Sequence, residues 1–402
     1  MGELQRPNKS AKRLNRSRVF SILSAKRRIS RPDLAKESGL NRATVGALVD
    51  ELLASNLARE VGPGYSRGGR PPMLVEFNPH GAFAIGASMR DHFWTLVRTN
   101  LDADIIDRVT VQMRDFSVSA AVSAIVEGVH TLVSRAEEAE LLPGIGVGSP
   151  GLVDVRSSHI VSAADVGWVD VPFGQLVESA TGIPATVANR SKVAALAEYW
   201  NTNSTVSGDL MYVSVGTGVA AGIIHDGELF VGTNSSAGEL GHITVLPDGP
   251  PCACGNRGCL QELVSERAIA QRARLALRSA STSELAGAAG RLPEHLTTDE
   301  VLSAAAAGDT TAVSVVEETA EFLSIGIANI VNLFNPRVIC LGGPVIEQSE
   351  LLYERTVEGV HRRAMSYPLS VLELRKSSLG GEAAAVGASV LILKSAEQLL
   401  FP

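Results

Sequence analysis

The sequence predicts an α/β protein that carries a small, mostly helical domain at its N-terminus. From about Phe83 onward, apolar strand-like runs alternate with helical stretches, which is typical of layered α/β folds. Ahead of them, residues 1–75 hold 15 Lys and Arg against 6 Asp and Glu, whereas the rest of the chain holds 21 against 37. A chain of 402 residues is long enough for two or three domains.

The composition narrows the class of protein. Hydrophobic residues make up 45% of the chain and aromatic residues 4%, which suits a soluble α/β protein. The N-terminus lacks the apolar core of a signal peptide, and no run of about 18 apolar residues could span a bilayer. We therefore expect a cytoplasmic protein. Its basic N-terminal segment indicates a polyanionic partner for that segment alone, with a merely solvated charged tail as the alternative.

Three short helices are predicted within the basic segment, at residues 14–27, 30–40 and 41–56. The second begins with the S-x-x-D capping pair Ser30 and Asp33. A turn that contains a glycine precedes the third helix, as in a helix-turn-helix. The first turn of the third helix is small and polar, so its side chains could approach base edges in a major groove. These residues are Arg42, Ala43 and Thr44.

Two strand-like runs, 57–61 and 73–77, follow the helices and enclose the glycine-rich segment 62-GPGYSRGGRPP-72. Its Arg67 and Arg70 could enter a narrow minor groove of double-stranded DNA. The pattern predicts a winged helix-turn-helix. A three-helix protein-docking module is the alternative, but such a module would not need the arginine-rich tip.

Strands and helices alternate along the rest of the chain. Three glycine-containing turns, each a weak signal alone, mark close backbone approaches at 148–151, 216–222 and 342–344. The predicted strands are 83–88, 144–149, 184–189, 210–216 and 337–343, and the predicted helices are 116–139, 191–200 and 310–334.

Three of the four cysteines lie in 251-PCACGNRGC-259. Cys252, Cys254 and Cys259 could form a disulfide, but this would leave one thiol unpaired and close only a very short loop. His242 lies ten residues before the first of them. Three thiolates and one imidazole complete a tetrahedral Zn²⁺ site with no open position, so we expect one structural zinc ion per chain. Cys340 lies in an apolar run and is expected to fill the core.

Taken together, these motifs resemble the repressor–ORF–kinase (ROK) family, in the subfamily of sugar-responsive transcriptional repressors with an N-terminal winged helix. The resemblance covers nearly the whole chain, and 238-GELGH-242 followed by the cysteine motif is its most specific part. The other matching segments are 66-SRGGRPP-72, 146-GVGSPGLVD-154, 212-YVSVGTGVAAG-222, 335-NPRVICLGG-343 and 379-LGGEAAAVGA-388.

The resemblance implies an actin-like body of the sugar-kinase type, with two α/β lobes around a cleft that binds sugar. The DNA-binding domain would comprise residues 1–78 and the body residues 79–402. The first lobe would span about 79–189 together with the C-terminal helix at about 384–402, and the second lobe about 190–383 with the zinc site.

The resemblance also argues against kinase activity. Family kinases carry an Asp as general base where this chain has Arg190, and a guanidinium is not a base near neutral pH. The first phosphate loop, normally Asp-x-Gly-x-Thr, corresponds to 88-SMRDH-92, although Gly216 and Gly218 of the second loop are kept. We therefore expect no enzymatic activity. An active sugar kinase with a DNA-binding head is the alternative.

The sugar-contacting residues of the family correspond to Asn189, Glu239, His242 and Gln261, the last of which is normally Glu. Asp165 stands where many relatives carry Asn. His242 would bind zinc through one ring nitrogen and a sugar hydroxyl through the other. A neutral hexose, an acidic or phosphorylated sugar attracted by Arg190, and no effector at all are the three alternatives.

The resemblance implies regulation by population shift. A homodimer, or a dimer of dimers, would present two winged helices to a pseudo-palindromic operator. Sugar binding would change the spacing or freedom of these heads. An effector-independent regulator is the alternative. Residues 310–334 and 384–401 are candidates for the dimer or inter-lobe contact.

Overall fold

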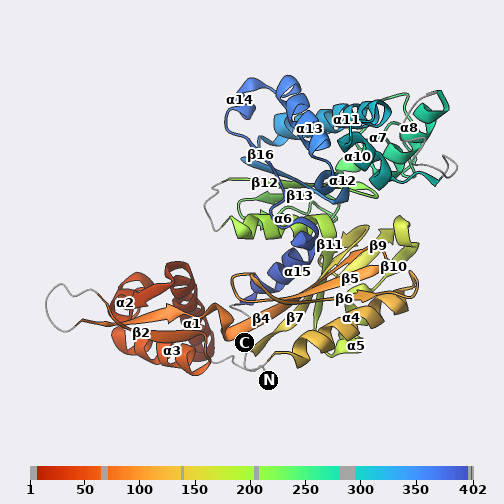
Figure 1. The fold of residues 1–402 in the computed structure, drawn as a ribbon. Coiled ribbons are helices and arrows are strands. Elements are labelled where there is room, and N and C mark those ends of the chain that lie inside the picture. Colours follow the sequence, from red (N-terminus) through yellow and green to blue (C-terminus); the bar gives the residue numbers. More distant parts are fainter. Residues whose placement is uncertain are drawn as a thin grey trace. The chain divides into compact units, whose positions relative to one another are not determined.

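A computed structural model describes residues 7–64, 71–136, 140–202, 208–279, 295–396 and 400 (Figure 1). The chain divides into two compact units. The first comprises residues 1–147, 174–186 and 388–402, and the second comprises residues 148–173 and 187–387. No helix in the described parts of the chain has both the length and the apolar character needed to cross a bilayer.

The N-terminal part of the first unit consists of three helices and an antiparallel sheet of order β1-β3-β2. The predicted cap at Ser30 is confirmed, since its side chain accepts a hydrogen bond from the Asp33 amide, and Asn41 caps the next helix by accepting one from the Thr44 amide. The helices bury one apolar face each, as the spacing predicts. The elements are α1 (Pro7–Lys26), β1 (Arg28–Ser30), α2 (Arg31–Ser38), α3 (Arg42–Ala54), β2 (Ala58–Pro63) and β3 (Met73–Phe77).

Strand β1 was not predicted from the sequence. It has only three residues, and it exists because Ile29 pairs with Val75 of β3. A strand of three residues is too short to show an alternating pattern in the sequence. It can be identified only from its pairing with β3, which is distant in the chain. Helix α1 also begins at Pro7, earlier than the predicted start at residue 14.

The rest of the first unit is built on a five-stranded sheet of order β11-β7-β4-β5-β6. Gly146 in β7 passes so close to Ala388 of α15 that a Cβ would lie 1.7 Å from the Ala388 carbonyl oxygen, so only glycine fits there. The strands are β4 (Ala82–Arg90), β5 (Phe93–Thr99), β6 (Ile105–Gln112), β7 (Glu140–Ser149) and β11 (Ala185–Asn189), and the helices are α4 (Val118–Ser134), α5 (Phe173–Thr181) and α15 (Ala383–Leu393).

The second unit contains a five-stranded sheet of order β14-β13-β12-β15-β16, with β12, β15 and β16 parallel. A small antiparallel sheet joins β8 (Leu152–Asp154), β9 (His159–Ala163) and β10 (Trp168–Val171). The strands of the larger sheet are β12 (Leu210–Val215), β13 (Val219–His225), β14 (Glu228–Leu229), β15 (Val338–Gly342) and β16 (Glu373–Lys376).

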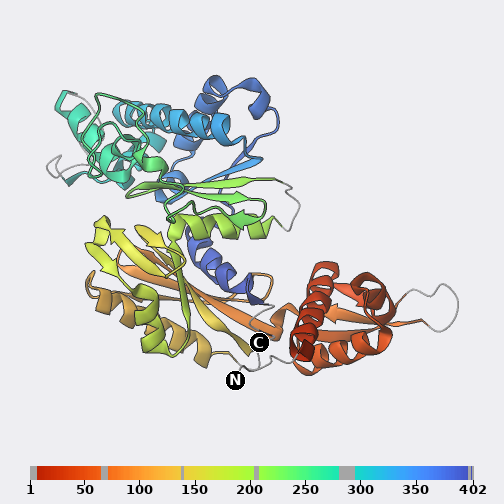
Figure 2. The same cartoon turned by 180° about the vertical axis from the view of Figure 1, so that it is seen from behind.

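Helices cover both faces of this larger sheet. Helix α6 (Arg190–Asn201) lies on one face, and α11 (Thr310–Phe334) and α13 (Glu350–Arg363) lie on the other, as both views show (Figures 1 and 2). The predicted helix 310–334 is confirmed at both ends. The remaining helices are α7 (Gln261–Val264), α8 (Glu266–Ser279), α10 (Thr298–Ala306), α12 (Pro344–Gln348) and α14 (Ser366–Leu369). Their apolar faces form one continuous core with β12, β13 and β15.

Candidate functional site

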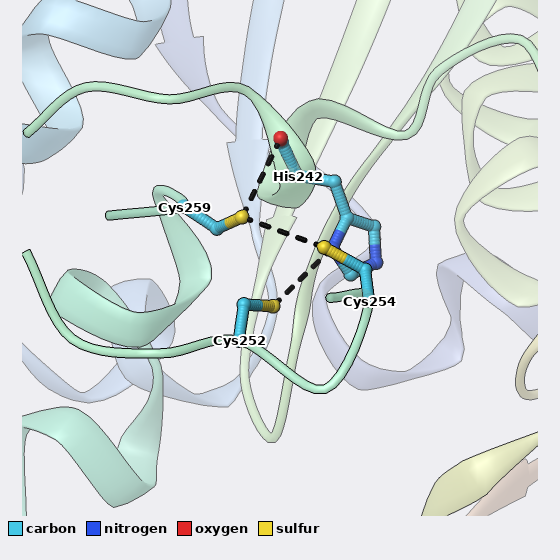
Figure 3. A group of neighbouring side chains, drawn as sticks. All are labelled: His242, Cys252, Cys254 and Cys259. Atoms are coloured by element: carbon cyan, nitrogen blue, oxygen red, sulfur yellow. Dashed lines mark hydrogen bonds between the residues drawn. The ribbon is translucent and has the colours of Figure 1, made fainter. Parts of the chain in front are cut away.

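A cluster of one histidine and three cysteines lies in the segment that follows β14. The ligand atoms of His242, Cys252, Cys254 and Cys259 all lie within 4.8 Å of one another (Figure 3). His242 Nδ1 is 3.6 Å from Cys252 Sγ, and the sulfurs of Cys254 and Cys259 are 3.7 Å apart. All four cysteines of the chain are free thiols. The residues predicted to bind a metal therefore form a group that could hold one ion.

Local backbone geometry brings these ligands together. The segment returns on itself through an antiparallel bridge between Thr244 and Cys259 and another between Pro251 and Arg257. Gly258 is essential to this turn, because its φ is +64° and a Cβ would lie 1.6 Å from the Leu246 carbonyl oxygen. We call residues 252–259 the cysteine knuckle.

The three thiols differ in their surroundings. Burial raises the pKa of Cys259 to about 12 and also raises that of Cys252. Cys254 is exposed, and its hydrogen bond from the Asn256 amide lowers its pKa. Since thiolates are the ligand form of cysteine, a metal ion that binds here must displace protons from the two buried thiols.

Asn189 is the N-cap of α6 and joins two parts of the predicted sugar site. Its Oδ1 accepts hydrogen bonds from the amides of Ser191 (2.9 Å) and Lys192 (3.3 Å), and its Nδ2 donates to the Gly151 carbonyl oxygen at 2.8 Å. The side chain thus ties the 148–151 turn to the start of α6. A side-chain amide carries two N–H groups, so this donor atom has capacity for a ligand as well.

Arg190 and Asp165 share one neighbour. Arg190 Nη2 donates to the Thr217 hydroxyl, and that hydroxyl donates to Asp165 Oδ2, each over 3.2 Å. Thr217 lies between Gly216 and Gly218, in the loop that the family resemblance relates to phosphate binding. The guanidinium at the position of the kinase base is therefore anchored to that loop.

Lys192 is a site residue that the sequence reasoning missed. Its side chain is only 2% exposed and donates to the Ser235 carbonyl oxygen, and burial lowers its pKa while the Glu239 carboxylate opposes that shift. Ser235 has a φ of +63°, and its hydroxyl donates to Asp154 at 3.0 Å. Lys192 thus supports the segment that leads to Glu239. A signal was present in the sequence, because the apolar run 193-VAALA-197 directly follows Lys192 and indicates a buried helix.

Glu239 and Gln261 both lie next to the metal-ligand cluster. Glu239 precedes the short helix Leu240–His242, and Gly238 before it packs against β13 so closely that a Cβ would lie 2.0 Å from the Ala221 carbonyl oxygen. Gln261 Nε2 is 3.5 Å from Cys252 Sγ. The adjacent Glu262 is paired with Arg267 instead, so its carboxylate does not take the place of Gln261.

The predicted DNA-contacting residues lie at the start of α3, as far as the structure describes them. Arg42 and Ala43 are exposed and Thr44 is half-buried. Gly46, one turn further, has open space around its α-carbon. The first turn of α3 therefore offers a small, accessible surface with one cation. Arg67 and Arg70 lie outside the described residues.

Comparisons with known proteins place this geometry in context. Residues 96–395 match the ROK family. The chain is 29% identical to the xylose repressor of Caldicellulosiruptor bescii over 97% of this chain and 98% of the repressor. It is 35% identical to the glucokinase of Halalkalibacterium halodurans, but over only 62% of this chain and 76% of the kinase. A solved ROK family transcriptional regulator, a homologue of the E. coli MLC protein, has a TM-score of 0.80 at 26% identity and covers 97% of this chain and 98% of its own.

Proposed function

Because the chain belongs to the ROK family, we propose that it is a DNA-binding transcriptional repressor of carbohydrate genes that responds to a neutral sugar. One observation carries this proposal: the similarity to repressors extends over the basic N-terminal part, whereas the similarity to the glucokinase covers 62% of the chain. A kinase has no use for a basic helical head. The head is what a repressor requires to bind its operator.

The N-terminal part is a winged helix-turn-helix in this proposal. Helix α3 is the recognition helix, and Arg42, Ala43 and Thr44 meet the major groove. The segment between β2 and β3 is the wing, with Arg67 and Arg70 as its minor-groove contacts. Binding to DNA is expected to weaken steeply with salt, because these cations displace counterions from phosphates.

The metal at the cysteine knuckle is a structural Zn²⁺ ion in this proposal. With Zn–S bonds of about 2.3 Å and Zn–N bonds of about 2.0 Å, a tetrahedral ion separates two sulfurs by about 3.8 Å and sulfur from nitrogen by about 3.5 Å. The observed separations of 3.7 Å and 3.6 Å support this assignment. Four protein ligands complete the coordination sphere, so the ion would hold the fold and orient His242 rather than activate water.

The effector site comprises Asn189, Arg190, Glu239, His242 and Gln261. Arg190 and the neighbouring Lys192 each have a carboxylate nearby: Arg190 and Asp165 both bond the Thr217 hydroxyl, and Lys192 lies in the field of Glu239. A site in which each described cation has a carboxylate nearby favours an uncharged polyol over a phosphate or a carboxylate. This observation supports a neutral sugar over an anionic one.

The protein is not a kinase in this proposal. Arg190 replaces the general base, and the segment 88-SMRDH-92 lacks the Asp and Gly of the first phosphate loop. A homodimer would place two heads on a two-fold symmetric operator in the cytoplasm. The sugar would release the operator by favouring a conformation with lower affinity for DNA.

The test uses the full-length protein and duplexes selected by it from a random DNA pool. We expect tight binding at low salt, loss of affinity on addition of xylose or glucose, and no effect of glucose 6-phosphate. Failure to retain any duplex at low salt would refute the repressor. Release by the phosphorylated sugar alone would instead assign an anionic effector, and production of ADP from ATP and glucose would establish a kinase.

A further inference from the structure

We call the N-terminal part of the chain up to the end of β3 the head. Arg27, between α1 and β1, has a backbone and side-chain environment that links the head to the part of the first unit that begins with β4. Arg27 ends α1 with its amide bonded to the Leu23 carbonyl oxygen (2.8 Å) and with a left-handed φ of +66°. Its carbonyl oxygen accepts from the Phe77 amide at 2.8 Å, and its guanidinium lies 5.1 Å from the centre of the Phe77 ring. The backbone and ring of the head thus direct this side chain.

The guanidinium points to a carboxylate outside the head. Its two terminal nitrogens donate to the two oxygens of Asp102, the first over 2.8 Å, in a bidentate ion pair within the first unit. The hydrogen bonds that Arg27 donates to Asp102 raise the pKa of Arg27. Asp102 lies in the turn between β5 and β6, and buried Asn100 accepts hydrogen bonds from the amides of Asp102 and Asp104, each at 2.9 Å. These bonds hold the backbone of the turn that carries Asp102.

The connecting segment is bonded on both sides. The Asn78 amide donates to the Leu57 carbonyl oxygen in the head at 3.0 Å, and the Leu101 amide donates to the Pro79 carbonyl oxygen at 2.9 Å. At Gly81 a Cβ would lie 2.2 Å from the Asn56 carbonyl oxygen, so no larger residue fits. β4 begins at the next residue. Residues 78–81 are thus a short bonded connection rather than a free tether.

We propose that Arg27 and Asp102 are positioning residues, which hold the head in one orientation on the turn between β5 and β6. An isolated exposed ion pair does little, but this one is bidentate, lies over an aromatic ring and acts together with the Pro79–Leu101 hydrogen bond. Because the head is held in one orientation, a rearrangement of the body would move the DNA-binding helix α3 as part of a rigid unit. This inference rests on the proposed function only for the DNA readout.

The test compares Arg27→Glu, Asp102→Arg and the charge-swapped double variant in the full-length protein. Hydrogen exchange at the Leu101 amide reports the junction directly and needs no DNA. We expect faster exchange there in both single variants, unchanged exchange in α2 and α3, and recovery in the double variant. Unchanged exchange at Leu101 in both single variants would overturn the proposal.

Affinity for the selected duplex gives the functional readout. If the head of a variant without the ion pair adopts the docked orientation for about a tenth of the time, both single variants bind the duplex about tenfold more weakly. The double variant should regain the wild-type affinity. A simple charge effect predicts the opposite sign for Asp102→Arg, because that variant adds a cation near DNA, and this result would overturn the proposal. Asp102→Asn replaces Asp102→Arg if the latter does not fold. If the wild-type protein binds no duplex, the proposed repressor function is refuted. The hydrogen exchange at Leu101 still tests the proposal for Arg27 and Asp102 in that case.

Discussion

The cysteine knuckle and the start of α6 lie in the same unit, but the knuckle keeps the residues that the family resemblance implies and the start of α6 keeps few of them. The knuckle and His242 keep all four of the predicted metal ligands, close enough together to hold one ion. The start of α6, residues 189–192, keeps only Asn189 as the resemblance implies and carries two cations, Arg190 and Lys192. A metal ligand set works only when complete, because each missing ligand opens the coordination sphere. A catalytic base can be replaced once phosphoryl transfer is no longer needed, provided that the new charges find partners.

The largest effect is expected from breaking the knuckle. Cys254→Ser removes one of four ligands from an exposed position, so the metal content should fall from one zinc per chain to nearly none. The free energy of unfolding should fall by several kcal/mol, because ligand binding contributes directly to folding. Metal analysis and thermal denaturation measure both effects. Asp248→Asn in the same segment is the control, and wild-type protein purified without metal would contradict the zinc assignment.

The start of α6 should be the next most sensitive. Lys192→Met removes the buried ammonium that bonds the Ser235 carbonyl oxygen and leaves Glu239 without its neighbouring cation. Loss of a buried hydrogen bond of this kind costs on the order of 1–3 kcal/mol, and sugar affinity should fall with it. Denaturant unfolding and calorimetric titration with xylose are the measurements. Lys36→Met, on the exposed side of α2, is the matched control.

The same variant has a characteristic pH dependence. Burial lowers the pKa of Lys192 in the folded state, so the unfolded chain binds more protons between that lowered pKa and the ordinary value of 10.5. The wild type should therefore gain stability relative to Lys192→Met as the pH rises through this window. A difference in unfolding free energy that stays flat up to pH 10.5 would show that Lys192 does not titrate on folding as described.

A smaller change is expected beside the knuckle, at Gln261. Gln261→Glu restores the family carboxylate at a position 3.5 Å from Cys252 Sγ. The metal should stay bound, since no ligand is lost, and sugar affinity should change by only about fivefold, equivalent to about 1 kcal/mol, as for one altered hydrogen bond. Titration with xylose and metal analysis test this. Loss of the metal would show that the added charge competes with the thiolates.

No gain of catalysis is expected from restoring the base alone. Arg190→Asp breaks the bond to Thr217 but leaves 88-SMRDH-92 without its Asp and Gly. A coupled assay with ATP and glucose should show no ADP release above background. Measurable turnover would mean that the first phosphate loop is dispensable and that the start of α6 alone separates this chain from a kinase.

Local features were predictable because their causes lie close together in the chain. The caps at Ser30 and Asn41 depend on amides three residues away, and the boundaries of α11 follow from periodicity and the preceding Asp309 cap. The clustering of His242 with the three cysteines was predictable for a similar reason, since all four residues lie within 18 residues of the chain.

The contacts that could not be predicted join distant residues. β1 needs β3, Arg27 needs Asp102 and Lys192 needs Ser235, partners that are 43 to 75 residues apart. The residues next to Lys192 in the sequence do not indicate that it bonds the Ser235 carbonyl oxygen, although the apolar helix around it indicates that it is buried.

By itself, the sequence determined the α/β class, the basic N-terminal part, the cluster of one histidine and three cysteines, and the family, because these depend on spacing, charge and local hydrogen bonding. Only the tertiary structure decided which charges face each other: Arg190 with Asp165 through Thr217, Lys192 near Glu239, and Arg27 on Asp102. The reason is that a cation can pair with any carboxylate that lies within a few ångströms of it. The packing of strands and helices decides which carboxylate comes that close, and their order along the chain does not.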